Sequence, residues 1–122
     1  SKGYIGLPLI DKLKTNSNLE IIECDLKDNL DFENIEGEFD TIIHLAAFIS
    51  VAESQEKPVE YLNNNVLKSI KLINNTRCHN FIFISTNAIH KDSNTADPES
   101  VYGMSKLIFE KILERSNMNY NI

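Results

Sequence analysis

The sequence has few of the residues on which small disulfide-linked, metal-stabilised or glycine-rich proteins depend. Its 122 residues include two cysteines, four glycines, three prolines and no tryptophan. Cys24 and Cys78 stand far apart, with no Cys-x-x-Cys pair and no histidine at metal-ligand spacing. The pattern therefore predicts neither a disulfide framework nor a metal site. We expect two reduced thiols, with Cys24 in the core or in the wall of a cofactor site.

Long apolar runs and an excess of basic charge are also missing. The apolar opening 3–10 is followed at once by the charged segment 11–14, so it is too short to span a membrane and is not a complete secretory signal. The formal net charge of −6 offers no positive field to nucleic acid or to an anionic membrane. These absences lead us to expect a cytoplasmic protein whose partner is a small molecule.

What the chain does contain is a regular alternation of apolar segments. With 42% hydrophobic residues it can bury one core, so residues 1–122 are expected to form a single domain. Three nearly continuous apolar runs predict strands that are covered on both faces, as in a parallel sheet: Leu19–Cys24, Asp40–Ala46 and Asn80–Thr86. Helix-period spacing predicts three helices, at about 5–14, 58–77 and 102–115. This order favours a doubly wound α/β fold.

Two glycines, Gly3 and Gly6, have the spacing of the second half of a Gly-x-x-Gly-x-x-Gly loop. Such a loop allows the backbone to approach a pyrophosphate, which the N–H groups and dipole of the next helix then stabilise. The pair is common by chance when taken alone. It indicates a nucleotide site only in combination with other motifs of the chain.

Two further motifs carry chemistry. Tyr102 and Lys106 are four residues apart and share one face of a predicted helix, so the ammonium can favour the phenolate and lower the pKa of the tyrosine. Ser85 and Thr86 end a predicted buried strand, and ligands of parallel sheets bind at the carboxyl ends of strands. Each motif has a simpler reading, a solvated helix face or a strand-end cap. The glycine turn, the Ser-Thr strand end and the Tyr-x-x-x-Lys helix are much more specific in this order than any one of them.

With these motifs the chain resembles the extended short-chain dehydrogenase/reductase family, the NAD-dependent epimerases and dehydratases. The matching segments are GYIG, CDLKD, FDTIIHLAAFISVAES, KPVEYLNNNV, FIFIST and VYGMSK. The resemblance implies a Rossmann-type fold, NAD as cofactor and a nucleotide-sugar substrate. It points to a UDP-hexose 4-epimerase of galactose metabolism, which oxidises C4 transiently and then reduces it from the other face. It also leaves a homodimer open.

The resemblance also implies roles for individual residues. Thr86 would bind a substrate hydroxyl, Tyr102 would act as base and then as acid, and Lys106 would hold the nicotinamide ribose and tune Tyr102. Asn65 would reach the cofactor from its helix, because a polar residue beside an apolar stripe needs a partner. The other implied NAD contacts are Gly3, Tyr4, Ile5 and Gly6 at the pyrophosphate, Asp25 and Leu26 at the adenine, and Leu45, Ala46, Ala47, Phe48 and Ser85 along the cofactor.

The chain departs from the family pattern at both ends and in one internal region. The first strand and first glycine would precede Ser1, and the sixth strand would begin near Ile122, so we expect a piece that lacks the substrate-binding half. Only one predicted strand stands where the family has two. The role of Asp25 stays open, because its local motif indicates adenine whereas its position, roughly 20 residues after Gly6, is that of the ribose-binding acid.

Two alternatives remain besides the epimerase. Dehydratase-like members carry an Asp-Glu pair directly after the position of Thr86, where this chain has Asn87 and Ala88, so another sugar-nucleotide dehydratase or decarboxylase is the weaker reading. The other alternative is an inactive fragment that at most binds nucleotide. Among the histidines, His44 is expected in the core with a hydrogen-bond partner and His90 at the surface.

Overall fold

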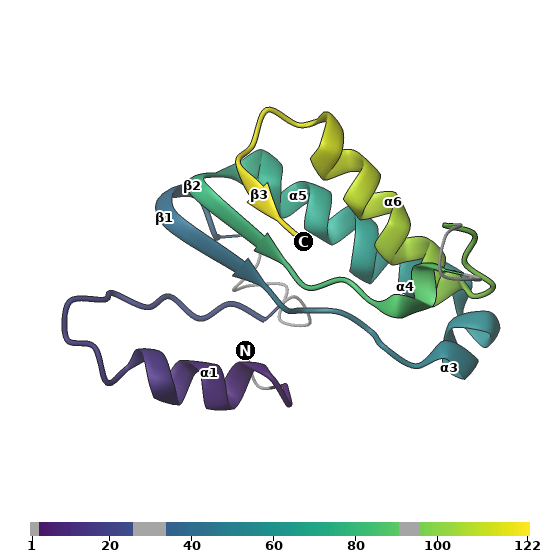
Figure 1. Ribbon diagram of the computed structural model, residues 1–122, viewed down its shortest axis with the longest axis horizontal. Coiled ribbons are helices and arrows are strands. Elements are labelled where there is room, and N and C mark those ends of the chain that lie inside the picture. The colour runs from purple at the N-terminus through teal and green to yellow at the C-terminus, as the bar shows by residue number, and fades with distance from the viewer. Residues whose placement is uncertain (1–2, 26–33, 91–95) are drawn as a thin grey trace.

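The computed structural model describes residues 3–25, 34–90 and 96–122 and shows a parallel sheet with helices on both sides (Figure 1). Strand β1 (Gly37–His44) pairs in parallel with β2 (Thr76–Phe83), which pairs in parallel with β3 (Tyr120–Asn121). Each pair of strands is joined through helices, since parallel neighbours cannot be joined by a tight turn. The predicted α/β fold, a partial Rossmann-type sheet, is confirmed.

The crossover from β1 to β2 is helical from Val51 to Asn75, with a break only at Lys57. Helix α3 (Val51–Glu56) is followed by α4 (Pro58–Leu62), a π-helical turn η1 (Asn63–Leu67) and α5 (Lys68–Asn75). The last three run on without a break and correspond to the predicted helix at 58–77. Pro58 stands in the first turn, where its missing N–H is not needed. The sequence pattern did not predict α3 or the π turn.

The second crossover contains the short 3₁₀ helix η2 (Asn87–Ile89) and the long helix α6 (Val101–Arg115). Ser100 caps α6, because its Oγ accepts a hydrogen bond of 3.0 Å from the N–H of Gly103. Helix α6 agrees with the helix predicted at 102–115. In the described stretches of the chain, every helix is too short or too polar to cross a lipid bilayer.

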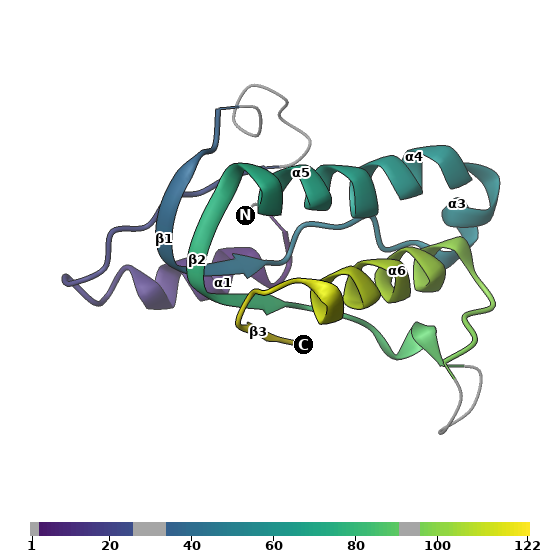
Figure 2. The ribbon, with the colours of Figure 1, turned by 90° about the horizontal axis from the view of Figure 1, so that it is seen from above.

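The hydrophobic core lies between the sheet and the helices α5 and α6, which cover one of its faces (Figure 2). Its buried members are Leu72, Phe81, Phe83, Phe109 and Leu113. Ring contacts join β2 to α6, with 4.9 Å between the ring centroids of Phe83 and Phe109. Burial of these side chains fixes α6 against the end of β2, which is where the predicted site residues stand.

Helix α1 (Gly6–Leu13) lies on the other side of the sheet, as Figure 1 shows, and confirms the helix predicted at 5–14. Only Gly6 and Ile10 of this helix are buried. Among the described elements, the extensive packing contacts join the strands and helices after residue 36, and none of them includes α1. The helix is therefore attached much more loosely than α5 and α6.

The prediction of a strand at Leu19–Cys24 is wrong. This segment comes after α1 without forming a ladder with any described strand, and Leu19 and Ile22 are 47% and 60% exposed. A run of apolar, β-branched residues becomes a strand only when another backbone pairs with it. The edge of β1 that faces away from β2 has no strand partner among the described residues, so Leu19–Cys24 does not pair there. An apolar sequence was therefore not sufficient to make this segment a strand.

The other two predicted strands are present, but their first and last residues differ from the prediction. The runs predicted at 40–46 and 80–86 form β1 and β2, which begin at Gly37 and Thr76 and end at His44 and Phe83. Beyond the ladder, a single bond of 3.4 Å runs from the N–H of Ile84 to the carbonyl of His44. The chains then diverge, so the segments 45–48 and 84–86 are loops at the carboxyl end of the sheet.

Candidate active site

Tyr102 and Lys106 lie in the first turns of α6, at the carboxyl end of the sheet. The residues are 9% and 4% exposed, and their spacing of four places both on the helix face that packs against the protein. The N–H of Tyr102 donates to Ser54 Oγ over 3.1 Å. Helix α3 thus holds the start of α6 through a buried hydroxyl, and the pair is not on a solvated helix face.

Lys106 reaches across to the end of β2. Its Nζ donates to the carbonyl of Ile84 over 2.8 Å and stands 4.5 Å from the centre of the Phe83 ring. Burial lowers the pKa of Lys106 from 10.5 to about 8, and the carboxylate of Glu110 acts in the opposite direction. Near neutral pH the ammonium is protonated, and one of its three N–H donors is used by Ile84.

The two hydroxyls after β2 are in different situations. Thr86 caps η2, because its Oγ1 accepts a bond of 3.2 Å from the N–H of Ala88. The capping role considered from the sequence therefore holds for Thr86, and among the described residues its own O–H donates no hydrogen bond. Ser85 Oγ is buried and has no hydrogen-bond partner among the described residues. An orphaned buried hydroxyl requires an explanation, and a bound ligand is one.

Asn65 is 3% exposed, and its side-chain amide is satisfied by the protein itself. Its Oδ1 accepts from the N–H of Phe48 (2.8 Å) and from Asn64 (3.1 Å). Its Nδ2 donates to the carbonyl of Phe48 (2.9 Å) and to Ser105 Oγ (3.0 Å). The sequence predicted that a polar side chain at position 65 needs a hydrogen-bond partner. In the structure its amide bonds to the loop after β1 and to helix α6. In this structure Asn65 positions the walls of the site.

The loop after β1 carries the residues expected along the cofactor. Leu45, Ala46, Ala47 and Phe48 are half-buried and irregular in backbone, and Asn65 ties the last of them to α6. The structure thereby brings the segments 45–48, 84–86 and 102–106 to one end of the sheet. This is the grouping that the sequence argument predicted for the Ser-Thr strand end and the Tyr-x-x-x-Lys helix.

Among the residues expected at the other end of the cofactor, Tyr4 and Ile5 are 96% and 55% exposed, and Gly3 has open space around its Cα. Gly6 is buried at the start of α1, and Asp25 is half-buried in the segment after this helix. Leu26 lies outside the described residues. The expected pyrophosphate and adenine contacts therefore stay predictions.

Four buried polar residues near the site were not assigned to it from the sequence. Ser105 Oγ donates to the carbonyl of Tyr102 over 2.7 Å, Ser54 Oγ accepts from the N–H of Tyr102, and Asn64 bonds Asn65. Ser69 Oγ lies 2.7 Å from His44 Nε2. Ser105, Asn64 and Ser69 are polar residues on predicted helices, which is their signal in the sequence. Ser54 lies in α3, which the sequence pattern did not predict.

The histidine and cysteine predictions agree with the structure. His44 is 4% exposed, packs among Phe81, Phe83 and Phe109, and is satisfied by Ser69. Burial, with a smaller effect of Lys106, lowers the pKa of His44 from 6.5 to about 3. His90 is exposed, and Cys24 packs against the core cluster and is not part of a disulfide.

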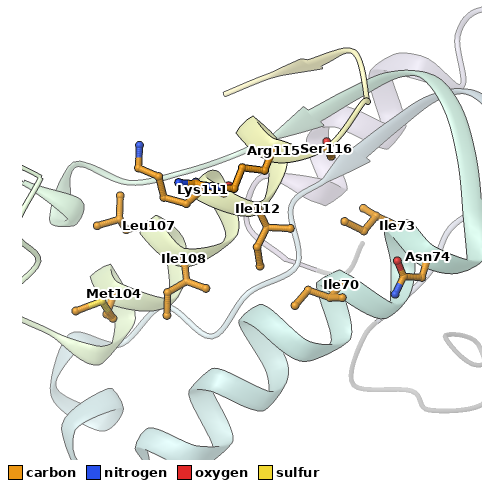
Figure 3. Close-up of a pocket in the computed structure, with 10 residues that line it drawn as sticks. All are labelled: Ile70, Ile73, Asn74, Met104, Leu107, Ile108, Lys111, Ile112, Arg115 and Ser116. Atoms are coloured by element: carbon orange, nitrogen blue, oxygen red, sulfur yellow. The ribbon is translucent and has the colours of Figure 1, made fainter.

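An apolar groove of about 690 Å³ lies away from these residues, between α5 and α6 (Figure 3). Its lining residues are Ile70, Ile73, Asn74, Met104, Leu107, Ile108, Lys111, Ile112, Arg115 and Ser116. None of them belongs to the predicted site. The groove is formed by α5 and by the side of α6 that does not carry Tyr102 and Lys106, so it is a separate surface.

A parallel sheet with helices on both sides, and with a Tyr-x-x-x-Lys helix packed against its carboxyl end, has the arrangement of a Rossmann-type domain. The family model described as "NAD dependent epimerase/dehydratase family" matches residues 1–122, and the chain belongs to that family.

Individual relatives agree with this assignment. The chain is 29% identical to UDP-glucose 4-epimerase 2 of Arabidopsis thaliana over 89% of its own length and 36% of that protein. It is 31% identical to the UDP-glucose 4-epimerase of Corynebacterium glutamicum, over 81% of this chain and 35% of the relative. The chain thus spans about a third of the length of these curated relatives.

Solved structures show the same fold. A UDP-glucose 4-epimerase from Thermotoga maritima superposes with a TM-score of 0.76 at 25% identity, covering 97% of this chain and 50% of that one. A UDP-N-acetylglucosamine 4-epimerase from Methanobrevibacter ruminantium superposes with a TM-score of 0.63 at 33% identity, covering 85% and 38%.

Proposed function

We propose that residues 1–122 are the NAD-binding part of an epimerase that inverts C4 of a UDP-hexose, most closely of the UDP-glucose/UDP-galactose type. The observation that carries the proposal is the convergence of Tyr102, Lys106 and Ser85 at the carboxyl end of the sheet. The names of the relatives support it, since several are UDP-glucose 4-epimerases. The chain matches only part of the length of these relatives, so the activity of the whole protein belongs to the proposal.

The residues present fit the nicotinamide end of NAD. Ser85 Oγ is buried without a partner, and Lys106 has donors beyond the one that binds Ile84. Lys106 would hold the ribose, and Leu45, Ala46, Ala47 and Phe48 would form the wall beside it. When bound, NAD supplies a hydride acceptor for C4 of the sugar and returns the hydride to its other face.

The residues of the chain would supply position and one proton. Thr86 would donate its O–H to the substrate, while its oxygen remains engaged with Ala88. Tyr102 would take the proton of the C4 hydroxyl and later return it. Ser54 and Ser105 would hold the backbone of Tyr102 during both steps.

Replacing Tyr102 with Phe removes the phenolic proton and leaves the helix unchanged. We expect turnover of UDP-galactose to UDP-glucose by the protein that carries this chain to fall by about two to four orders of magnitude, with NAD affinity retained. A coupled turnover assay and calorimetric NAD titration measure the two quantities. Tyr120→Phe is the matched control, because Tyr120 lies in β3 and should leave both unchanged. Unchanged turnover in Tyr102→Phe would refute the proposal.

One observation favours a second candidate, a nucleotide-binding fragment without turnover. The turn that carries Gly3, Tyr4 and Ile5 is exposed and is not joined to Tyr102 or Lys106 by a described contact. NAD binding without epimerisation of any UDP-hexose would favour this candidate. The homodimer and cytoplasmic location expected from the sequence remain predictions, and sedimentation equilibrium would test the first of them.

A further inference from the structure

The start of helix α3 is closed by a side chain from another helix. Ser50 caps α3, because its Oγ accepts a bond of 3.2 Å from the N–H of Glu53. A serine followed three residues later by a glutamate is the pattern of a capping box, in which the carboxylate bonds the N–H of the serine in return. Here that N–H donates to the hydroxyl of Tyr61 over 3.1 Å. The cap of α3 therefore includes a residue of α4.

The hydroxyl of Tyr61 joins both halves of this cap. It accepts from the N–H of Ser50 and donates to Glu53 Oε2 over 3.1 Å, while the tyrosine itself is 1% exposed. Burial, and to a smaller extent the bond to Glu53, raises the pKa of Tyr61, so the phenol keeps its proton at neutral pH. Lys57 binds the other carboxylate oxygen, Glu53 Oε1, at 2.9 Å. The hydroxyl thus has a donor and an acceptor, both in the first turn of α3.

The segment that leads into this cap is the wall beside the predicted cofactor site. The ring of Phe48, the last residue of the wall, packs edge-on against the ring of Tyr61 with 5.4 Å between the centroids. Asn65 binds the N–H and the carbonyl of Phe48 at 2.8 and 2.9 Å. Residues 48–50 are therefore held by two side chains of one helical run, the amide of Asn65 and the ring and hydroxyl of Tyr61.

The same short helix also holds the start of α6, beside which it lies (Figure 1). Ser54 is completely buried, and its Oγ accepts from the N–H of Tyr102 over 3.1 Å. The side-chain amide of Gln55 accepts from the N–H of Val101 and donates to the carbonyl of Glu99, both over 3.3 Å. Because α3 has six residues, a shift of its first turn also moves Ser54 and Gln55.

We propose that Tyr61 is a positioning residue, whose hydroxyl fixes α3 and thereby sets the place of Tyr102 relative to the wall 45–48. Its effect on turnover rests on the proposed function, whereas its effect on the positions of α3 and α6 does not.

The test is hydrogen exchange followed by mass spectrometry, without NAD or substrate, on the protein that carries this chain. Tyr61→Phe removes the hydroxyl and keeps the ring that packs against Phe48. We expect the amides of 48–54 and 100–106 to exchange roughly fivefold faster, the factor that corresponds to one net hydrogen bond. The amides of β2, at 76–83, should keep their rates. Unchanged exchange at 100–106 would overturn the proposal, because α3 would then transmit nothing to α6.

Variants of Glu53 test the same connection at an exposed position, where the fold is not at risk. Glu53→Ala removes the acceptor of the Tyr61 hydroxyl and should also speed exchange at 100–106. Glu53→Gln keeps an oxygen in that place and should restore most of the protection. Lys57→Gln is the matched control, because it breaks the ion pair with Glu53 and leaves both bonds of Tyr61 in place. Equal exchange in Glu53→Ala and Glu53→Gln would contradict the role of the hydroxyl.

Turnover separates a positioning role from a purely structural one. In an active protein, Tyr61→Phe should lower kcat by about tenfold, because a small displacement of Tyr102 from the reacting hydroxyl costs rate. The KM for UDP-galactose should stay within about twofold, since the substrate contacts are unchanged. A variant that melts at a lower temperature but keeps its kcat would show a structural role and overturn the positioning role. If Tyr102→Phe refutes the proposed function, the exchange measurements keep their meaning.

Discussion

At the scale of the residue, the buried polar groups around α6 connect the site to the stability of the fold. His44, Asn65, Ser69 and Ser105 are each less than a tenth exposed, and each has a partner on another segment or turn. Removing one member would leave the other unsatisfied, at a cost of about 1–3 kcal/mol. Their positions are therefore constrained by folding as well as by any role at the site.

The depressed pKa of His44 predicts loss of stability in acid. Above pH 6.5 the imidazole is neutral in both the folded and the unfolded chain. As the pH falls from 6.5 towards 3, the unfolded chain takes up a proton that the fold excludes, so the free energy of unfolding decreases. We expect a contribution of about 2 kcal/mol between pH 7 and pH 5, measured by urea unfolding.

Two substitutions test this assignment. His44→Phe should reduce the pH dependence by that amount, because it removes the titrating group from the core. His79→Asn, at an exposed position, should keep the pH dependence of the unmodified chain. If the His44 variant has the same dependence as the unmodified chain, another group is responsible.

At the scale of the element, close packing between η2 and α6 fixes the distance between Thr86 and Tyr102. A Cβ built on Gly103 would overlap the carbonyl oxygen of Ala88 and stand 3.0 Å from Pro98 Cβ. Only glycine lets the loop after β2 lie this close to the helix. Gly103 thus has a steric function, which is separate from the chemical roles proposed for Tyr102 and Lys106.

Gly103→Ala should therefore destabilise the fold by about 1–3 kcal/mol or displace η2. The free energy of unfolding in urea and the amide resonances of residues 86–89 would show either result. Gly3→Ala is the matched control, since nothing lies within 4 Å of the Cβ that it would add. Equal stability of the two variants, with unshifted resonances at 86–89, would contradict the steric account.

At the scale of the whole molecule, much apolar surface is left uncovered, and the described sheet is open at its outer edges. Ile43 and Ile84, at the carboxyl end of the sheet, are 36% and 41% exposed. The outer edge of β1 has no partner among the described strands, and α1 is only loosely packed. Unpaired edges and exposed apolar side chains lower stability and favour association.

We therefore expect residues 1–122 alone to be marginally stable, to bind NAD weakly and to show no epimerase activity. Urea unfolding, calorimetric NAD titration and a UDP-hexose turnover assay would measure the three properties. A cooperative unfolding transition together with micromolar NAD affinity would show that the open edge and the loose α1 matter less than we infer.

The sequence by itself determined the parallel α/β character, three of the helices and the shared face of Tyr102 and Lys106. These features depend on local periodicity, which needs only the spacing of residues along one segment. The ends of the strands were predicted less accurately, because a ladder ends where the backbone of the neighbouring strand diverges.

Only the tertiary structure decided which segments meet. It kept Leu19–Cys24 out of the described sheet, used the amide of Asn65 to hold Phe48 and Ser105, and placed the Ile84 carbonyl within hydrogen-bond distance of Lys106 Nζ. A strand needs a partner and a buried polar group needs a satisfying atom, and both come from elsewhere in the chain. A local sequence pattern indicates that a strand or a buried polar group needs a partner, and the tertiary packing determines which residue provides it.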